Sequence, residues 1–362
     1  MNMLTRTECT AMRGLAIMAI VLHNYCHFIG RIVKENEYQF LSHNNDLLWD
    51  RLMHPDELLP AHLLSYFGHY GVPVFLFLSG YGLVAKYEHQ LSQPVGVLRF
   101  ARYNYLKLLR MLVVGLTLFI MVDAVTPGRF SFHWYNIVAQ LLMYINVLPN
   151  PEGIIWPGIY WFFGLMMQFY LVYRLLLYRR GTAPVLVLVA LCWLLQVVCT
   201  PDGETLNRLR YNCIGGMLPF GLGILAGRWQ HRCAGLQVSR WLWALGALLS
   251  AVLVTAMSFN FHTWLWVPLV VVAGSIALVK ALPPQALHGL AMVGSLSAAM
   301  FVAHPIARKL FITVAWKGDI YDGLALYLLA TVGLAWAVRQ VISRLPAPHL
   351  DEPSASSTSQ SS

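Results

Sequence analysis

Apolar stretches of the length of a transmembrane helix recur along nearly the whole chain. A helix needs about 20 mostly apolar residues, within a range of roughly 17 to 25, to cross the hydrocarbon core of a bilayer. The stretches of this length are 11–30, 66–85, 103–123, 157–178, 184–200, 212–228, 241–259, 264–282, 289–311 and 323–342. We therefore expect an all-α polytopic membrane protein, a bundle of about ten transmembrane helices.

An eleventh apolar stretch, 134–149, is shorter and ends at the turn-forming residues Pro149 and Pro151. It predicts a short interfacial or re-entrant helix rather than a full span. The C-terminal residues 346–362 are rich in serine, which predicts a disordered tail after a transmembrane domain at 1–345.

The composition agrees with this pattern and excludes several other classes of protein. Apolar residues make up 58% of the 362 residues and charged residues 11%, whereas soluble domains carry about 25% charged residues. The 6 cysteines are too sparse for a disulfide framework, although Cys199 and Cys213 could pair. The net charge of +9 is not gathered in one basic domain, so we expect no nucleic-acid partner.

The distribution of lysine and arginine predicts the orientation in the bilayer. With a cytoplasmic N-terminus and alternating spans, most of the 25 basic residues fall on the inner side, as the positive-inside rule requires. Both termini are then cytoplasmic. The largest outer loop, at about 31–65, is acidic and contains His43, His54 and His62.

The first predicted helix carries ionisable residues, which are costly in lipid and usually functional. His23 follows Arg13 by ten residues, about 15 Å along a helix, so the two would have separate roles. A near-neutral imidazole suits a general base acting on a hydroxyl. A histidine hydrogen-bonded between packed helices is the alternative. The neighbouring Asn24 and His27 favour a polar cavity over a single packed histidine.

The fourth and ninth spans carry further polar residues. Aromatic residues at 160–163 predict an interface belt, and Gln168 lies deeper, where it could line a cavity. His304 lies at a depth similar to that of His23 by helical rise, and Pro305 marks a kink.

Glycine and basic residues mark the second span and the start of the third. Pro73 and three glycines in 71–82 favour close helix packing as a structural role. Two basic pairs, Arg99 with Arg102 and Lys107 with Arg110, are each spaced to share a helix face and could hold a phosphate-rich nucleotide at the inner surface.

These landmarks, in this order, resemble the acyltransferase 3 family of bacterial membrane-bound sugar and polysaccharide O-acyltransferases. The ordered set is Arg-Gly-Leu-Ala…His in the first helix, Val-Pro-Val-Phe-Leu-Phe-Leu-Ser-Gly in the second, a basic start of the third, Trp161…Tyr170, and Ser297…His304-Pro305. The resemblance covers roughly residues 5–342. It implies a multi-pass protein of the bacterial inner membrane.

The resemblance also implies roles for individual residues. Arg13 and His23 match the family's essential first-helix pair, in which the histidine activates the acceptor hydroxyl. Lys107 and Arg110 match the basic pair that serves acyl-CoA from the cytoplasm, with Arg99 and Arg102 as further contributors.

The chain departs from the family pattern in its first helix. The family leaves ten residues between the arginine and the histidine, whereas nine intervene here, so His23 is rotated by about 80° from the face of Arg13. A π-bulge would restore the register. Otherwise His27 becomes a rival base. Thr10 stands where the family often has aspartate, and Lys107 where arginine is usual.

The sequence therefore predicts acyl transfer, most simply of acetyl, from cytoplasmic acyl-CoA to a hydroxyl of a cell-envelope glycan. No metal is required. Asn24, Ser79 and Ser297 are the candidates to stabilise the oxyanion, and Trp161, Gln168 and His304 are further candidate substrate contacts. The alternative is a transporter or flippase of a lipid-linked glycan or small metabolite, although no inverted repeat supports it.

Overall fold

The computed structural model describes residues 3–91, 93–230 and 238–350. All regular secondary structure in these ranges is helical, which confirms the all-α prediction. Six of the ten predicted spans fall on helical segments long and apolar enough to cross a membrane: Leu59–Gln90, Val97–Val125, Gly158–Leu177, Arg240–Met257, Ser297–Trp316 and Ile320–Arg344. Three more fall on shorter apolar helices: Ala183–Val197, Cys213–Trp229 and Val267–Ala281. The chain is thus a multi-pass membrane protein.

The first half of the chain contains α1 (Arg6–Cys26), α2 (Ser42–Met53), α3 (Leu59–Phe67), η1 (Gly68–Tyr70), α4 (Gly71–Val84), η2 (Ala85–Gln90), α5 (Val97–Val125), α6 (Trp134–Leu141), η3 (Ile145–Val147), η4 (Gly158–Tyr160), α7 (Trp161–Val172) and η5 (Tyr173–Leu177). The second half contains α8 (Ala183–Val197), α9 (Glu204–Arg210), α10 (Cys213–Trp229), α11 (Arg240–Met257), α12 (Phe261–Trp264), α13 (Val267–Ala281), α14 (Pro284–Ser295), α15 (Ser297–Trp316) and α16 (Ile320–Arg344).

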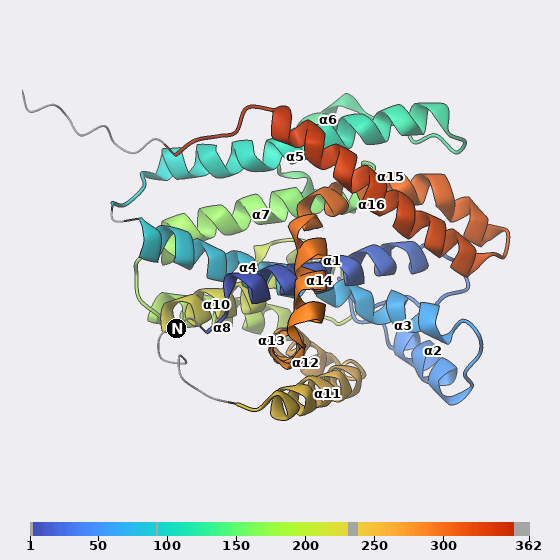
Figure 1. Cartoon of the computed structure of the whole chain (residues 1–362), viewed down its shortest axis with the longest axis horizontal. Helices are drawn as coiled ribbons and strands as arrows, with labels where there is room; N and C mark the ends of the chain where they lie inside the picture. The colour runs from blue at the N-terminus through green and yellow to red at the C-terminus, as the bar shows by residue number, and fades with distance from the viewer. Residues whose placement is uncertain (1–2, 92, 231–237, 351–362) are drawn as a thin grey trace, which may run out of the picture.

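The central helix is α1, which contacts α3, α4, α14 and α15 (Figure 1). A capping box begins this helix: the Glu8 backbone N–H donates to the Thr5 hydroxyl at 3.2 Å, and the Thr5 backbone N–H donates to the Glu8 carboxylate at 2.7 Å. Glu8 also pairs with Lys280 of α13 at 3.2 Å. These contacts fix where α1 begins and hence the depth of every side chain along it.

Glycines allow the helices around α1 and α4 to approach one another closely. A Cβ on Gly71 would lie 2.4 Å from the Ala16 carbonyl oxygen of α1, and one on Gly80 would lie 2.3 Å from the Phe220 carbonyl oxygen of α10. Membrane helices commonly pack through such small residues. The structural role expected for these second-span glycines is therefore present at both positions.

The structure corrects the prediction of one continuous span at 289–311. The helix breaks at Leu296, and α14 crosses α1 steeply, whereas α15 continues through Pro305 (Figure 1). Tight packing accompanies this crossing, since a Cβ on Gly294 would lie only 1.8 Å from the Thr10 carbonyl oxygen.

One further expectation is wrong. The residues expected to form an aromatic interface belt, at 160–163, include Tyr160 and Trp161, which are buried because both pack inside the bundle. Cys199 and Cys213, whose pairing the sequence left open, are free thiols. The segment 134–149 forms only the eight-residue α6 and the single turn η3, as a short non-spanning helix requires. The predicted disordered tail lies mostly at 351–362, outside the described residues.

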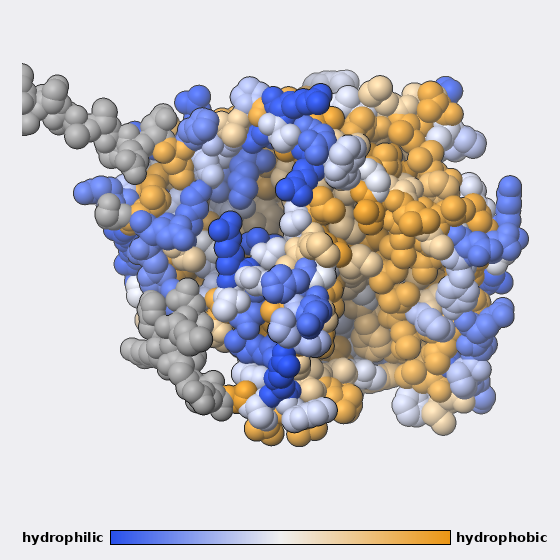
Figure 2. Space-filling model, in the orientation of Figure 1, coloured by the Kyte–Doolittle hydropathy of each residue, from blue (hydrophilic) through white to orange (hydrophobic). Residues whose placement is uncertain are grey.

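Apolar side chains also cover the outside of the protein, which is the arrangement a membrane requires. None of the described residues of α11 is buried, and Leu245 and Leu248 on it are 60% and 64% exposed. Figure 2 shows a broad hydrophobic band over α15 and α16 with hydrophilic side chains on either side of it. Lipid is the solvent that suits such a surface.

Candidate active site

A single large cavity of about 1410 Å³ follows α1 along most of its length. Its lining includes Arg6 near the start of α1 and Phe28 just beyond the end, which are about 33 Å apart at 1.5 Å per residue. Figure 2 shows the surface hollowed between α5 and α14, on the hydrophilic side of the apolar band. The cavity therefore extends through most of the thickness of a bilayer.

One end of the cavity, here called the basic end, is lined by Arg6, Arg13 and Lys107. None of the three forms an ion pair with a carboxylate in the described part of the chain. The acidic residues Glu8 and Glu88 are already engaged, the first with Lys280 and the second with Arg228 at 2.8 Å. The basic end thus presents cationic groups that an anionic ligand can pair with.

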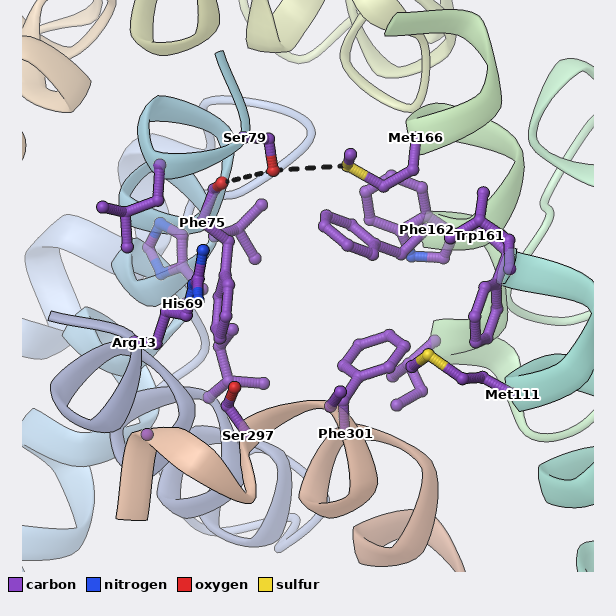
Figure 3. Close-up of a pocket in the computed structure, with 18 of the residues that line it drawn as sticks. Arg13, His69, Phe75, Ser79, Met111, Trp161, Phe162, Met166, Ser297 and Phe301 are labelled. Atoms are coloured by element: carbon purple, nitrogen blue, oxygen red, sulfur yellow. Dashed lines mark hydrogen bonds between the residues drawn. The ribbon is translucent and has the colours of Figure 1, made fainter. Parts of the chain in front are cut away.

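The middle of the cavity, here called the waist, is apolar. Figure 3 shows the aromatic and methionine side chains that surround it, with Ser79 and Ser297 at its edge. The apolar waist residues are Phe75, Met111, Phe162, Met166 and Phe301. The Ser79 hydroxyl donates to the Phe75 carbonyl at 2.8 Å, so it is already engaged with its own helix. An uncharged group suits this passage better than a charged one.

Beyond the waist, α1 presents His23 to the cavity. Its Nδ1 lies 2.7 Å from the Ser65 carbonyl oxygen, which can only accept a hydrogen bond. Nδ1 therefore carries the hydrogen, and Nε2 of the neutral ring holds a lone pair. Gly68 makes room for this arrangement, because a Cβ there would lie 2.6 Å from the Cβ of His23.

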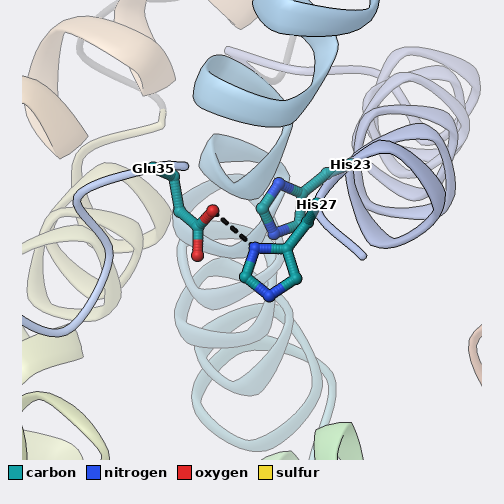
Figure 4. Close-up of side chains that lie close together, drawn as sticks. All are labelled: His23, His27 and Glu35. Carbon is teal, nitrogen blue, oxygen red and sulfur yellow. Dashed lines mark hydrogen bonds and ion pairs between the residues drawn. The ribbon is translucent and has the colours of Figure 1, made fainter. Parts of the chain in front are cut away.

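His27 and Glu35 form a hydrogen-bonded pair next to His23 (Figure 4). His27 Nδ1 lies 2.7 Å from a Glu35 carboxylate oxygen, and the rings of His23 and His27 are 5.2 Å apart. Burial raises the pKa of Glu35, but the imidazoles of His23 and His27 outweigh it and hold this pKa well below its usual range. Glu35 is therefore an anion that orients His27 with its Nε2 free.

The side chains of His23, His27 and Glu35 also have the spacing of a metal site. One ligand atom from each lies within 4.8 Å of the others. The present hydrogen bond between His27 and Glu35 satisfies both groups without an ion. We therefore interpret the three as an acid–base cluster.

The far end of the cavity, here called the acidic end, is lined by Glu35, Glu37 and Glu152. Glu152 accepts hydrogen bonds from the Tyr38 hydroxyl at 2.9 Å and from the Trp161 indole N–H at 3.0 Å. Burial raises the pKa of Glu152, and burial together with Glu152 and Glu35 raises the pKa of Glu37 well above its ordinary value. Carboxyl and aromatic groups of this kind can hydrogen-bond to and stack on a hydroxyl-rich ligand.

The structure brings most of the sequence-predicted site residues into this cavity. The residues that line it are Arg13, His23, Asn24, His27, Ser79, Lys107, Trp161 and Ser297. The first helix contains no π-bulge: α1 is regular from Arg6 to Cys26, and Arg13 and His23 still line the same cavity. The π-turns of the described chain lie instead at η2 and η5.

The other predicted site residues lie outside the cavity wall. Arg110 donates to the Ile342 and Leu345 carbonyls at 2.7 and 2.8 Å and so caps α16. The Gln168 amide is engaged with Asn212 and Cys213 at the start of α10. His304 is fully buried, and its Nδ1 is hydrogen-bonded to the Met300 carbonyl oxygen at 3.0 Å. Arg99 and Arg102 lie in the first turns of α5.

Sequence reasoning missed Arg308 and Glu152, both of which line the cavity. A signal for Arg308 was present, because a cation in the middle of an apolar stretch is costly and usually functional. Glu152 lies in a loop between Pro151 and Gly153, where no local pattern indicates a site.

Comparison with known proteins identifies one family. The family model Acyl_transf_3, an acyltransferase domain, matches residues 8–340. No curated protein and no solved structure matches the chain.

Proposed function

The chain belongs to the acyltransferase 3 family of membrane acyltransferases, and on that premise we propose that it transfers acetyl from cytoplasmic acetyl-CoA to a hydroxyl of a cell-envelope glycan. The observation that supports this most directly is the single cavity that joins an unpaired basic cluster to an imidazole–carboxylate cluster.

The donor binds at the basic end. Arg6, Arg13 and Lys107 pair with the phosphates of CoA, which stay at the cytoplasmic face. The pantetheine arm then extends into the waist and carries the thioester toward His23, about 15 Å beyond Arg13. Only uncharged groups need to enter the apolar waist.

His23 is the general base of the reaction. Its Nε2 lone pair accepts the proton of the acceptor hydroxyl while the oxygen attacks the thioester carbonyl. His27, oriented by Glu35, is the rival base, because its Nε2 is also free. His23 lies one helical turn closer to the thioester than His27 does, which favours His23 as the base.

The acceptor binds at the acidic end, where the aromatic side chains of Trp161 and Tyr38 line the cavity and Glu152 accepts hydrogen bonds. A neutral sugar fits these groups better than an anionic ligand, since the ionised Glu35 repels a negative charge. Glu37 and Glu152, whose pKa values are raised by burial, can hydrogen-bond to sugar hydroxyls in their protonated form. The lipid bilayer and a glycan precursor are the partners expected on this side.

The first prediction separates the two histidines. Membranes containing the wild type are incubated with radiolabelled acetyl-CoA, and label in envelope glycans is measured. We expect His23→Ala to lower transfer by about 10²- to 10⁴-fold, the range for loss of a general base. His288→Ala is the matched control, because His288 is an exposed helical histidine whose Nδ1 contacts the Pro284 carbonyl outside the cavity.

Three outcomes would change this assignment. Loss of transfer only in His27→Ala would move the base one turn along α1. Loss of wild-type transfer on adding EDTA would reassign His23, His27 and Glu35 as metal ligands. Transport of a glycan without dependence on CoA would favour the transporter alternative.

A further inference from the structure

Arg308 is a buried cation without a carboxylate partner. It lies on α15, is 5% exposed and lines the cavity. It forms no salt bridge in the described part of the chain. The next residue behaves differently, since Lys309 pairs with Asp123 at 2.9 Å. An unpaired buried guanidinium is costly, so its retention needs a reason.

The guanidinium is held against the same end of α1 that carries His23 and precedes His27, and it lines the same cavity as both. Arg308 Nη1 donates to the backbone carbonyl of Asn24 at 3.2 Å and to its side-chain oxygen at 3.1 Å. The guanidinium carbon lies 3.7 Å from the centre of the Phe28 ring. Asn24 and Phe28 each follow a histidine, His23 or His27, by one residue. These contacts use Nη1 and one face, and arginine has five N–H donors in all.

The reaction creates a negative charge in this part of the cavity. Attack on a thioester converts the carbonyl oxygen into an oxyanion, and preorganised donors near that oxygen are among the largest contributions to catalysis. We propose that Arg308 stabilises this oxyanion, an inference that rests on the proposed acyl transfer.

In this scheme the steps balance. The acceptor O–H loses its proton to Nε2 of His23, and the oxygen forms a bond to the carbonyl carbon. The carbonyl π electrons move to oxygen, where Arg308 stabilises the charge. The intermediate then re-forms the C=O bond and breaks the C–S bond, and CoA thiolate takes the proton from His23.

The other candidate donors are less suited to this role. The Asn24 amide N–H group donates to the Ile20 carbonyl at 3.1 Å, and the Asn24 oxygen already accepts from Arg308. The Ser79 hydroxyl donates to the Phe75 carbonyl. Ser297 lies eleven residues before Arg308, about 16 Å away along α15 toward the waist.

The test compares Arg308→Ala, Arg308→Gln and Arg308→Lys with Lys309→Ala in the acetyl-transfer assay. Lys309→Ala is the matched control, because it removes the adjacent cation of the same helix outside the cavity. We expect kcat to fall about 10²- to 10³-fold in Arg308→Ala and Arg308→Gln, with little change in KM for either substrate. The kcat of Arg308→Lys, which keeps the positive charge, should fall less.

Chemical rescue separates this role from a folding defect. Guanidinium ion at concentrations that leave the wild type unaffected should raise the rate of Arg308→Ala but not that of Lys309→Ala. If Arg308→Ala is unstable, the loss of kcat is measured in Arg308→Gln instead, because its amide keeps a hydrogen-bond donor for Asn24. A raised KM for the acceptor with unchanged kcat would overturn the inference. Arg308 variants that transfer acetyl at the wild-type rate would overturn it as well. Absence of acyl transfer by the wild type would instead overturn the proposed function itself.

Discussion

At the scale of single residues, backbone carbonyls and carboxylates decide which imidazole nitrogen is basic. The Ser65 carbonyl fixes the tautomer of His23, and Glu35 fixes that of His27, so both rings present Nε2. Sequence reasoning identified both histidines from their place in an apolar helix. It could not find Ser65 as the partner of His23, because the contact joins residues 42 positions apart.

Glu152 shows the limit of residue-level prediction more sharply. Burial raises its pKa, although the hydrogen bonds from Tyr38 and Trp161 act in the opposite direction, and these two partners come from a distant loop and from the start of α7. A side chain whose environment is assembled from distant segments carries no local sequence signal.

The stability of the protein should depend on pH through Glu152. Its pKa is higher in the folded than in the unfolded state, so the folded state binds more protons in the interval between the two values. Stability is therefore lost as pH rises from about 4.3, the unfolded value, through the folded pKa. Glu152→Gln keeps an oxygen for Tyr38 and Trp161 but removes the charge. We expect its melting temperature to match the wild type near pH 4 and exceed it near pH 8.

Thermal unfolding in detergent across this pH range measures the effect. The exposed Glu204, paired with Arg208 at 2.6 Å on the surface, provides the control variant Glu204→Gln. A difference between Glu152→Gln and the wild type that grows toward acid pH instead would mean that the folded protein favours the ionised carboxylate.

At the scale of secondary-structure elements, apolar length predicted helices well and their ends poorly. Each predicted span overlaps a helix, but α5 begins at Val97 rather than 103, and the span at 289–311 is broken at Leu296. The break is a tertiary effect, because it lets α14 cross α1 through Gly14 and Gly294. Apolar periodicity does not encode such a crossing.

This crossing predicts that Gly294 is intolerant of any side chain. A Cβ there would lie 1.8 Å from the Thr10 carbonyl oxygen, a backbone atom that cannot move aside cheaply. We expect Gly294→Ala to destabilise the protein by about 1–3 kcal/mol, the usual range for overpacking. Melting temperature in detergent is the measurement.

Gly289 is the matched control on the same helix, because a Cβ there would meet nothing within 4 Å. Gly289→Ala should be neutral or slightly stabilising, since alanine is the better helix former. Equal loss of stability in both variants would show that helix propensity, rather than the crossing, governs this segment.

At the scale of the whole molecule, the cavity has opposite electrostatic character at its two ends. Unpaired Arg13 and Lys107 mark one end, and the anionic Glu35, with Glu37 and Glu152 beside it, marks the other. On the proposed function, this arrangement gives the reaction a direction across the bilayer, since the charged donor suits only the basic end.

The corresponding prediction concerns sidedness. In sealed inverted vesicles, whose cytoplasmic face is outside, externally added acetyl-CoA should support transfer. In right-side-out vesicles the same addition should give almost none, because acetyl-CoA does not cross a bilayer. Permeabilising both preparations should make their rates equal. Transfer confined to right-side-out vesicles would reverse the proposed orientation.

The apolar waist has a consequence for the cell's energy supply. A polar cavity about as long as a bilayer is thick would conduct protons if water filled it from end to end. The ring of Phe75, Phe162 and Phe301 with Met111 and Met166 disfavours a continuous water column, as hydrophobic constrictions do in channels. The protein can therefore keep a route for an uncharged acyl group open while the proton gradient across the membrane is preserved.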